Sequence, residues 1–472
     1  MISNRIGRLS RRAMIRLVAA GAGGALLAAC GGSDPPQGAD LQDATPVPVA
    51  PPTDVPQSTA TVALLAADAT AAPVSTSIPT SSVDAANTIT LWHYDEQLKL
   101  VAQTFEQANP GVKVDIKSYW PDSPYFPLLR NALKKGTGAP DLAVIGPGQL
   151  AELVAAGGLA DLAAAPFDGS KFQQDMVEST WGQSLFDGKL FGMPWNVEPA
   201  SFWYRADVLK TAGLESEPEQ IEAQTWEELF ALGQALKAKK EGITLLPDAT
   251  DIFWTVVGQQ GFGWFDGSRV LIRQKGVKAA TIAAKARKLK LDANTDLNDF
   301  SVLLRQGLAV GWLASPGFQA FLAQYAPETV GAWRAVAVPE GPLLWAGSLL
   351  IMPEQGKKQE LAWKFVQHMC ATVAAQNLWF TTTRAFPAYK PAWDDPLYDE
   401  PVDFFGGQTV YRAWTKVVEQ APASIFSPHD QDADDAVTNE LKQMLYNDAD
   451  PEQAMASAEA EVLRKVPGAT AG

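Results

Sequence analysis

Two lobes of alternating strands and helices are the fold class that the sequence predicts, an α/β protein. Strand-like and helix-like segments alternate between Ile89 and Ile145, and a second α/β series starts near Ala200. About 385 residues follow Asn87, which is more than one hydrophobic core of ordinary size accommodates. The whole chain is 47% hydrophobic and 9% aromatic, which is the composition of a globular protein, and all its aromatic residues lie beyond Thr90.

The first elements read as strand, helix, strand. Ile89–Tyr94 is a short β-prone run, and residues 112–116 alternate as a second strand through Val112, Val114 and Ile116. Between these strands, apolar residues recur at helical spacing, and Pro110-Gly111 ends the helix. The recurring residues are Leu98, Val101, Ala102 and Phe105.

A second helix and a third strand continue the alternation. The helix carries Leu128, Leu129, Ala132 and Leu133 and closes at Gly136. Leu142–Ile145 follows as a strand, and Gly146-Pro147-Gly148 reads as the turn after it. Strands connected by helices form mainly parallel sheets, whose ligand sites lie beyond the carboxyl ends of the strands.

The second series opens with the strand-like run Ser201–Tyr204. Thr225-Trp226-Glu227-Glu228 is a capping box that starts a helix through Leu229, Leu232 and Leu236. Further elements are expected as strands near Leu308–Leu313 and Leu349–Met352, a helix at Gln359–Ala371, and a continuous helical tail from Val437 to Val466.

The first 87 residues predict export and a tether rather than fold. Residues 1–29 form a signal peptide, in which Arg11 and Arg12 resemble a twin-arginine export signal. Leu27-Ala28-Ala29-Cys30 resembles a lipoprotein cleavage box, which makes Cys30 the lipid-bearing residue. Residues 30–87 are rich in Pro, Ala, Thr and Ser, so we expect a disordered tether.

Charge and the scarce reactive residues exclude several functions. The net charge of −15 argues against nucleic acid as a partner, since phosphates need a basic surface. Cys370 is expected to be an inert core residue, and His93, His368 and His429 lack metal-ligand spacing. Asp430, Asp432 and Asp434 lack the Gly and Glu of a calcium loop and favour a helix N-terminus instead. We expect no metal, no cofactor and no catalytic residue.

The globular part resembles the family 1 extracellular solute-binding proteins of ABC importers. The resemblance covers about residues 88–466 and rests on motifs in the family order. These are Thr90-Leu91-Trp92, Phe105–Val112, Gly138–Leu142, Gly188–Pro194, Trp203–Leu209, Thr225–Leu229 and Ala362–Val366.

The resemblance implies the two-lobe periplasmic-binding-protein-like fold with a hinged cleft between the lobes. Residues 88–199 would form part of lobe 1, residues 200–346 mainly lobe 2, and residues 347–472 would return to lobe 1 and supply C-terminal helices that cross the hinge. The crossings would fall near Val197–Ala200, near Trp345–Ser348 and in the C-terminal segment.

Sugar sites pair aromatic platforms with carboxylates, amides and arginines. From the position of such residues beyond strand ends and at the crossings, and from the resemblance, we expect these ligand-binding residues: Tyr94, Glu96, Trp195, Asn196, Glu198, Trp254, Trp312, Ser315, Trp345, Gly347, Ser348 and Arg384. Two departures from the family remove maltodextrin contacts, namely Ser315-Pro316 running into Gly317, and Gly146-Pro147-Gly148. Maltose is therefore not the expected ligand.

The function expected is that of a monomeric receptor, lipid-anchored on the extracytoplasmic face of the cell membrane, which passes a sugar or oligosaccharide to an ABC permease. A receptor for a polyol, a phosphodiester or a cationic osmolyte is one alternative. A secreted glycan-active enzyme is another, although nothing in the chain singles out the pair of carboxylates that it needs.

Overall fold

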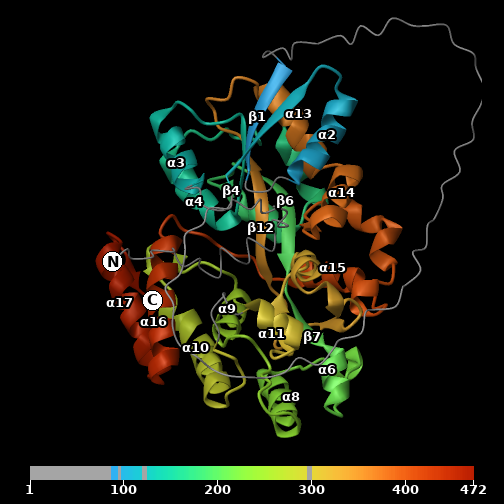
Figure 1. Ribbon diagram of the computed structural model, residues 1–472. Coiled ribbons are helices and arrows are strands. Elements are labelled where there is room, and N and C mark those ends of the chain that lie inside the picture. The colour runs from blue at the N-terminus through green and yellow to red at the C-terminus, as the bar shows by residue number, and fades with distance from the viewer. Residues whose placement is uncertain (1–86, 94–96, 120–124, 295–299) are drawn as a thin grey trace, which may run out of the picture. The chain divides into compact units, whose positions relative to one another are not determined.

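The computed structural model describes residues 87–93, 97–119, 125–294 and 300–472 (Figure 1). Arg11, Arg12, Cys30, Tyr94 and Glu96 lie outside the described residues, as does the expected tether. Within the described ranges, no helix combines the length and the apolar composition needed to cross a bilayer.

Lobe 1 is built on a six-stranded sheet with the strand order β13-β6-β12-β3-β1-β2. β1 pairs in parallel with β2 and β3, whereas β12 runs antiparallel to both β3 and β6. The strands are β1 Thr88–His93, β2 Lys113–Ser118, β3 Leu142–Ile145, β6 Met193–Pro199, β12 Leu344–Ile351 and β13 Phe386–Pro387.

Helices cover both faces of this sheet, because the central strands are apolar on both sides. β3 is buried throughout, as expected of a strand between two helical layers. One face packs on α2 (Leu98–Ala108), α13 (Gln359–Cys370) and α14 (Val373–Thr383), and the other on α3 (Tyr125–Lys135) and α4 (Pro147–Ala156). The four residues expected to face the core from the first helix are the buried residues of α2.

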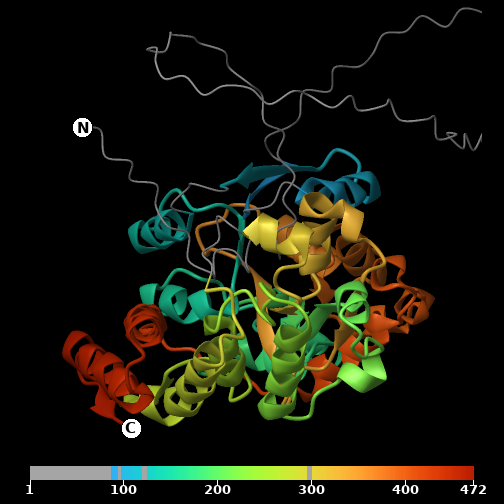
Figure 2. The ribbon, with the colours of Figure 1, turned by 60° about the horizontal axis from the view of Figure 1, so that its bottom comes forward.

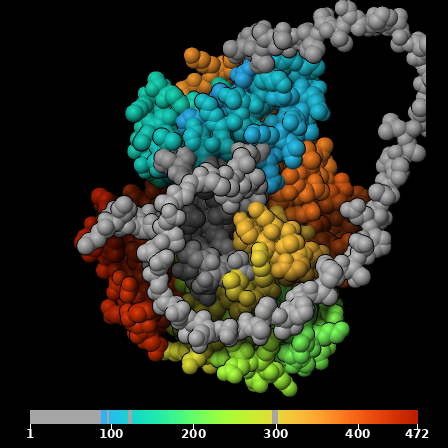
Figure 3. Space-filling view, in the orientation of Figure 1, coloured from blue at the N-terminus to red at the C-terminus, as the bar shows by residue number. Residues whose placement is uncertain are grey.

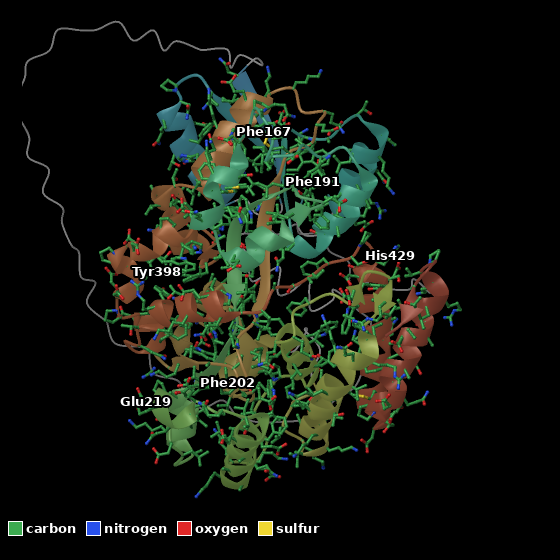
Figure 4. All side chains as sticks on the ribbon, turned by 180° about the vertical axis from the view of Figure 1, so that it is seen from behind. Phe167, Phe191, Phe202, Glu219, Tyr398 and His429 are labelled. Carbon is green, nitrogen blue, oxygen red and sulfur yellow. The ribbon has the colours of Figure 1, made fainter. Side chains whose placement is uncertain are left out.

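Lobe 2 is built on a three-stranded antiparallel sheet with the order β10-β7-β11. Alternation along β7 (Ser201–Arg205) sends Phe202 and Tyr204 to the main core of lobe 2 and Trp203 to a second aromatic core. β10 is Gly311–Ala314 and β11 is Trp333–Val336. Figure 4 shows Phe202 among the helices of lobe 2 and Phe167 and Phe191 within lobe 1.

The remaining elements surround these two sheets (Figure 2). Near lobe 1 are α5 Glu178–Gln183 and the hairpin β4 Leu185–Phe186 with β5 Lys189–Leu190. Lobe 2 and the junction carry α6 Ala206–Thr211, α7 Pro218–Ile221, α8 Trp226–Lys239, α9 Thr250–Gly258, α10 Ile272–Lys288, α11 Phe300–Gln306, α12 Phe318–Tyr325 and α15 Val410–Gln420. A small sheet joins β8 Phe265–Asp266, β9 Arg269–Val270 and β14 Thr470–Ala471.

The expected continuous helical tail is wrong, because the tail is two helices. α16 (Asp430–Asn447) ends at Asp448, which takes the left-handed conformation with φ 52°. Asp450 then caps α17 (Pro451–Lys465) by accepting a hydrogen bond from the Gln453 amide at 2.9 Å. Both helices pack against α10, and their apolar residues belong to the main core of lobe 2 (Figure 2).

Gly146-Pro147-Gly148 is not a free turn. Gly146 is the N-cap residue of α4, and Pro147 occupies its first position, where the missing amide costs nothing. Leu128 is also misplaced by the sequence pattern, since its side chain is exposed rather than in the core. The capping box at Thr225 is confirmed, with the Glu228 amide 3.2 Å from the Thr225 hydroxyl.

Candidate functional site

Strand direction brings several chain ends to one edge of the lobe 1 sheet. β1, β3 and β6 point the same way, so their carboxyl ends share an edge with the beginnings of β12 and β13. We call it the junction edge, because a single residue, Ala200, separates β6 from β7 of lobe 2. Parallel sheets bind ligands beyond such carboxyl ends.

Polar side chains lie on β6 and β12 at this edge. Asn196 and Glu198 are both buried near the end of β6, after the register shift that separates Pro194 from Asn196 in the pairing with β12. Across the ladder, Ser348 pairs with Asn196, and Ala346 pairs with Glu198. The pairing sets the three polar residues side by side.

Glu198 is the most unusual group of this set. Its side chain is fully buried, and neither carboxyl oxygen makes a well-formed hydrogen bond, although the Ser315 hydroxyl and the Gly317 amide lie close enough to act on it. Burial raises the pKa of Glu198 to about 8, and the Ser315 hydroxyl and Gly317 amide nearby offset only part of that rise. The Asn196 side-chain oxygen is likewise buried without a hydrogen bond.

Such groups are costly unless something satisfies them. A buried donor or acceptor without a partner costs about 1 to 3 kcal/mol, and a charged group costs more. Asn196 and Glu198, two residues apart on β6 and both with unmet hydrogen-bonding capacity, are therefore the candidate polar site at the junction edge. Its capacity suits a ligand with several hydroxyl or amine groups.

Gly347 has a structural role in this arrangement. A Cβ atom built on it would lie 2.7 Å from the Asn196 carbonyl oxygen. Only glycine allows the close approach of β12 to β6 that aligns Ser348 with Asn196.

Two of the expected aromatic residues are half-buried on the lobe 2 core. Trp345 stacks on Phe262, with ring centroids 6.4 Å apart, and its indole N–H makes no hydrogen bond. Trp254 on α9 contacts Phe253 and Trp264 edge-on, at 5.2 and 6.1 Å. Their partial exposure leaves aromatic surface for a ligand.

Trp195 and Trp312 are instead core residues. Trp195 packs in the lobe 1 core on Trp379, with ring centroids 4.5 Å apart. Trp312 packs on Phe318 at 5.3 Å in the second aromatic core. Both rings are buried, at 0% and 4% exposure.

Arg384 lies just before β13, next to the junction edge. It caps α14 in the left-handed conformation, with φ 67°. Burial raises the pKa of Tyr411 in the second aromatic core, and the positive charge of Arg384 offsets part of that rise.

An aromatic group at the carboxyl end of β1 was missed. The Trp92 and Tyr119 rings are 4.9 Å apart, and Tyr119 and Tyr125 are 5.6 Å apart. The Tyr125 hydroxyl donates toward the carbonyl oxygens of Trp92 and Val144, at 3.1 and 2.7 Å. Trp92 packs on the sheet face that α3 and α4 cover. The position of Tyr119 directly after the second strand was the available signal.

The family model for bacterial extracellular solute-binding proteins matches residues 93–376, more than half of the chain. The chain belongs to this family. The extracellular location and the binding role of the family therefore apply to it at that level.

Relatives of this solute-binding protein are also named as binding proteins. A lactose-binding protein of Rhizobium radiobacter is 26% identical over 53% of this chain, and the match spans 62% of that protein, less than two thirds of its length. A putative binding protein of Brucella abortus is 23% identical over 79% of this chain and 90% of its own.

Solved structures share the two-lobe fold of this solute-binding protein. A family 1 extracellular solute-binding protein superposes with a TM-score of 0.71 over 81% of this chain and 100% of its own, at 18% identity. A Bifidobacterium animalis binding protein in complex with β-1,6-galactobiose gives 0.68 over 82% and 99%, at 20% identity. At these identities the likeness establishes the fold.

The cysteine, histidine and aspartate residues of this solute-binding protein that could carry chemistry lie in packed or helix-capping positions. Burial raises the pKa of the Cys370 thiol, which lies in the lobe 1 core. His368 lies 2.8 Å from the Thr104 hydroxyl, and burial lowers its pKa. Asp430 and Asp432 start α16, and in the described part of the chain no group of three His, Cys, Asp or Glu residues could hold a metal.

Proposed function

We propose that the protein captures a carbohydrate between its lobes and delivers it to an ABC importer on the extracytoplasmic face of the membrane. The observation that carries this proposal is the buried, unsatisfied pair Glu198 and Asn196 at the junction edge. Sugar hydroxyls both donate and accept hydrogen bonds, so one ligand satisfies both residues. Trp345 and Trp254 offer faces for its C–H groups.

The names of relatives favour a saccharide. One is a lactose-binding protein, and two others, from Halalkalibacterium halodurans and Bacillus subtilis, are arabinooligosaccharide-binding proteins. Maltose is not proposed. The family's aromatic and acidic maltodextrin contacts are replaced here by Gly146-Pro147-Gly148 and by Gly317.

We also propose that lipid on Cys30 anchors the protein and that Arg11 and Arg12 direct its export. Residues 30–87 then tether the binding lobes to the membrane near the permease. An import role needs a membrane permease and an ATPase, which separate subunits supply.

A thermal-shift screen of the mature protein against mono- and oligosaccharides, polyols and osmolytes tests this proposal. A ligand at 100 times its dissociation constant stabilises the protein by about 2.7 kcal/mol, which a melting curve detects. We expect saccharide hits, and we expect Glu198→Ala to weaken the best of them by about 1 to 3 kcal/mol, because it leaves ligand hydroxyl groups buried without a partner. A panel without a saccharide hit, or undiminished binding by Glu198→Ala, contradicts the proposal.

A cationic solute is the second candidate. Glu198 is a buried carboxyl group whose pKa is set by burial, Ser315 and Gly317, without a neighbouring cation as a cause. A quaternary ammonium group on the ligand would supply that charge, and aromatic faces would hold it. Stabilisation by betaine or choline rather than by sugars in the same screen would favour this candidate.

A further inference from the structure

Ser315 of lobe 2 lies beside the junction edge of the lobe 1 sheet. It directly follows β10, which pairs antiparallel with β7 and sets Ala314 opposite Ser201. Continuing this register by one residue sets Ser315 opposite Ala200. Ala200 separates β6 from β7, and Glu198 lies two residues before it. The register alone therefore brings Ser315 close to the carboxyl group of Glu198.

The turn that starts with Ser315 directs hydrogen-bond donors at this carboxyl. Ser315 is buried, and its carbonyl oxygen accepts a hydrogen bond from the Phe318 amide at 3.0 Å as α12 begins. The Ser315 hydroxyl and the Gly317 amide both act on Glu198. Figure 3 shows the segment of α11 and α12 (yellow to light orange) below lobe 1 segments (blue to teal) and above lobe 2 segments (green).

Charged groups do not determine the state of Glu198. Its pKa reflects burial, the Ser315 hydroxyl and the Gly317 amide. Neither α12 nor β12 contains Asp, Glu, Lys or Arg. The other titratable groups of the elements around the end of β6 are Arg384 before β13, Glu178 on α5, and Tyr411, Arg412, Lys416 and Glu419 on α15. Arg384 acts on Tyr411, and Arg412 pairs with Asp399 at 2.7 Å.

A ligand changes the balance around this carboxyl. Donors favour the ionised form of Glu198, whereas burial opposes it more strongly, so the free protein holds the carboxyl neutral at pH 7. Saccharide hydroxyl groups add donors, and their hydrogen bonds to a carboxylate are stronger than those to a neutral carboxyl group. The ligand-bound state therefore favours the carboxylate.

We propose that Ser315 is a positioning residue of the binding site: with the Gly317 amide it holds the Glu198 carboxyl toward the ligand, and this carboxyl releases its proton when ligand hydroxyl groups bind to it. The inference rests on the proposed carbohydrate function. The O–H bond of the carboxyl breaks, its electron pair stays on the carboxylate, and the proton passes to the buffer. Ser315 acts through Glu198, which differs from the direct ligand contact that the sequence predicts for it.

Titration calorimetry of the mature chain with lactose, β-1,6-galactobiose and arabinotriose tests the inference on the tightest binder of the three. Runs at pH 7 in buffers of different ionisation enthalpy count the protons exchanged. The wild type should release about 0.5 to 1 proton per ligand, and its affinity should rise at least about fivefold between pH 6 and pH 9. Glu198→Gln should release no proton, and its affinity should stay constant over this range.

Variants of Ser315 test the positioning role. Ser315→Ala removes a donor and raises the pKa of Glu198 further, so the rise in affinity should move to higher pH by about half a unit or more. Ser315→Thr keeps the hydroxyl and should restore the wild-type profile. The matched control is Ser201→Ala, since the buried Ser201 hydroxyl on the neighbouring strand accepts a hydrogen bond from the Trp414 indole at 2.8 Å. It should keep the wild-type profile.

Melting curves show which variants fold, and the proton count of the wild type and Glu198→Gln tests the inference even if Ser315→Ala does not fold. No proton release by the wild type, proton uptake, or equal release by Glu198→Gln overturns the inference while the proposed function stands. An unshifted profile in folded Ser315→Ala, or an equal shift in Ser201→Ala, overturns it as well. If no saccharide binds the wild type, the proposed function fails and the inference fails with it.

Discussion

Glu198 connects the stability of the protein to pH. Its pKa in the folded protein, about 8, is above its ordinary value of 4.5, so the folded state binds this proton more tightly than the unfolded state. The resulting stabilisation is complete below about pH 4.5 and is lost as the pH rises through about 8.

Glu198→Gln removes this titration and keeps the shape of the side chain. The free energy of unfolding of the wild type should therefore fall, relative to that of Glu198→Gln, by a few kcal/mol between pH 5 and pH 9. Urea unfolding at a series of pH values measures this difference. A difference that stays constant across the range would show that Glu198 is not held in its neutral form.

Two tryptophans should separate ligand-site fluorescence from core fluorescence. Trp345 is half-buried with a free indole N–H, whereas Trp195 is enclosed by Trp379 and His93 in lobe 1. Saturating ligand should change the emission of the wild type, and Trp345→Phe should remove most of that change. Trp195→Phe should preserve it. If Trp195→Phe removed the change and Trp345→Phe kept it, Trp195 and not Trp345 would be the residue that contacts the ligand.

At the scale of elements, Asp430 holds the third crossing, residues 421–429, to lobe 2. Asp430→Ala leaves the amides of Trp264 and Ser427 without their acceptor, which should lower the free energy of unfolding by about 3 kcal/mol. Asp432→Ala, at an exposed position of the same helix turn, should cost only about 0.5 kcal/mol. Chemical denaturation checks both values, and equal effects would contradict a specific role for Asp430.

Local signals predicted the elements that local interactions decide. The apolar spacing of α2, the strand β3 and the capping box of α8 are all visible in short stretches of sequence. The break between α16 and α17 also had a local signal in Asp450-Pro451, but the apolar spacing on either side obscured it. The pair Gly146-Pro147 is typical both of a turn and of a helix start, and the structure has the helix start.

Long-range contacts explain what sequence patterns missed at the site. Trp195 is buried by the packing of α13 and α14 on the sheet, and no pattern within β6 reveals this, since every residue of the strand is buried. The Phe426 contact with Gly148 joins residues that are far apart in sequence. No spacing rule predicts such a contact, whereas the polar residues at the β6 crossing were predictable from strand order and the family resemblance.

At the scale of the whole molecule, the lipid anchor is testable apart from ligand binding. Cys30→Ala should release the protein from membranes into the soluble fraction, because the acyl chains are lost. Cys370→Ala is the control, since Cys370 lies in the lobe 1 core and should not affect partitioning. Detergent phase separation of both variants measures the outcome. Retention of Cys30→Ala on membranes would exclude this anchor.

Capture between two lobes predicts a change of size. β6 and β12 connect the lobes directly at Ala200 and at the start of β12, and residues 421–429 connect them again, so closure requires bending at these three crossings. Small-angle X-ray scattering of the mature protein, with and without a saturating amount of the best ligand from the screen, measures that closure. The ligand concentration is chosen to saturate the wild type and to stay below the dissociation constant of Glu198→Ala. At that concentration, the radius of gyration of the wild type should decrease. That of Glu198→Ala should not change. Identical scattering of the free and ligand-bound wild type would contradict capture by lobe closure.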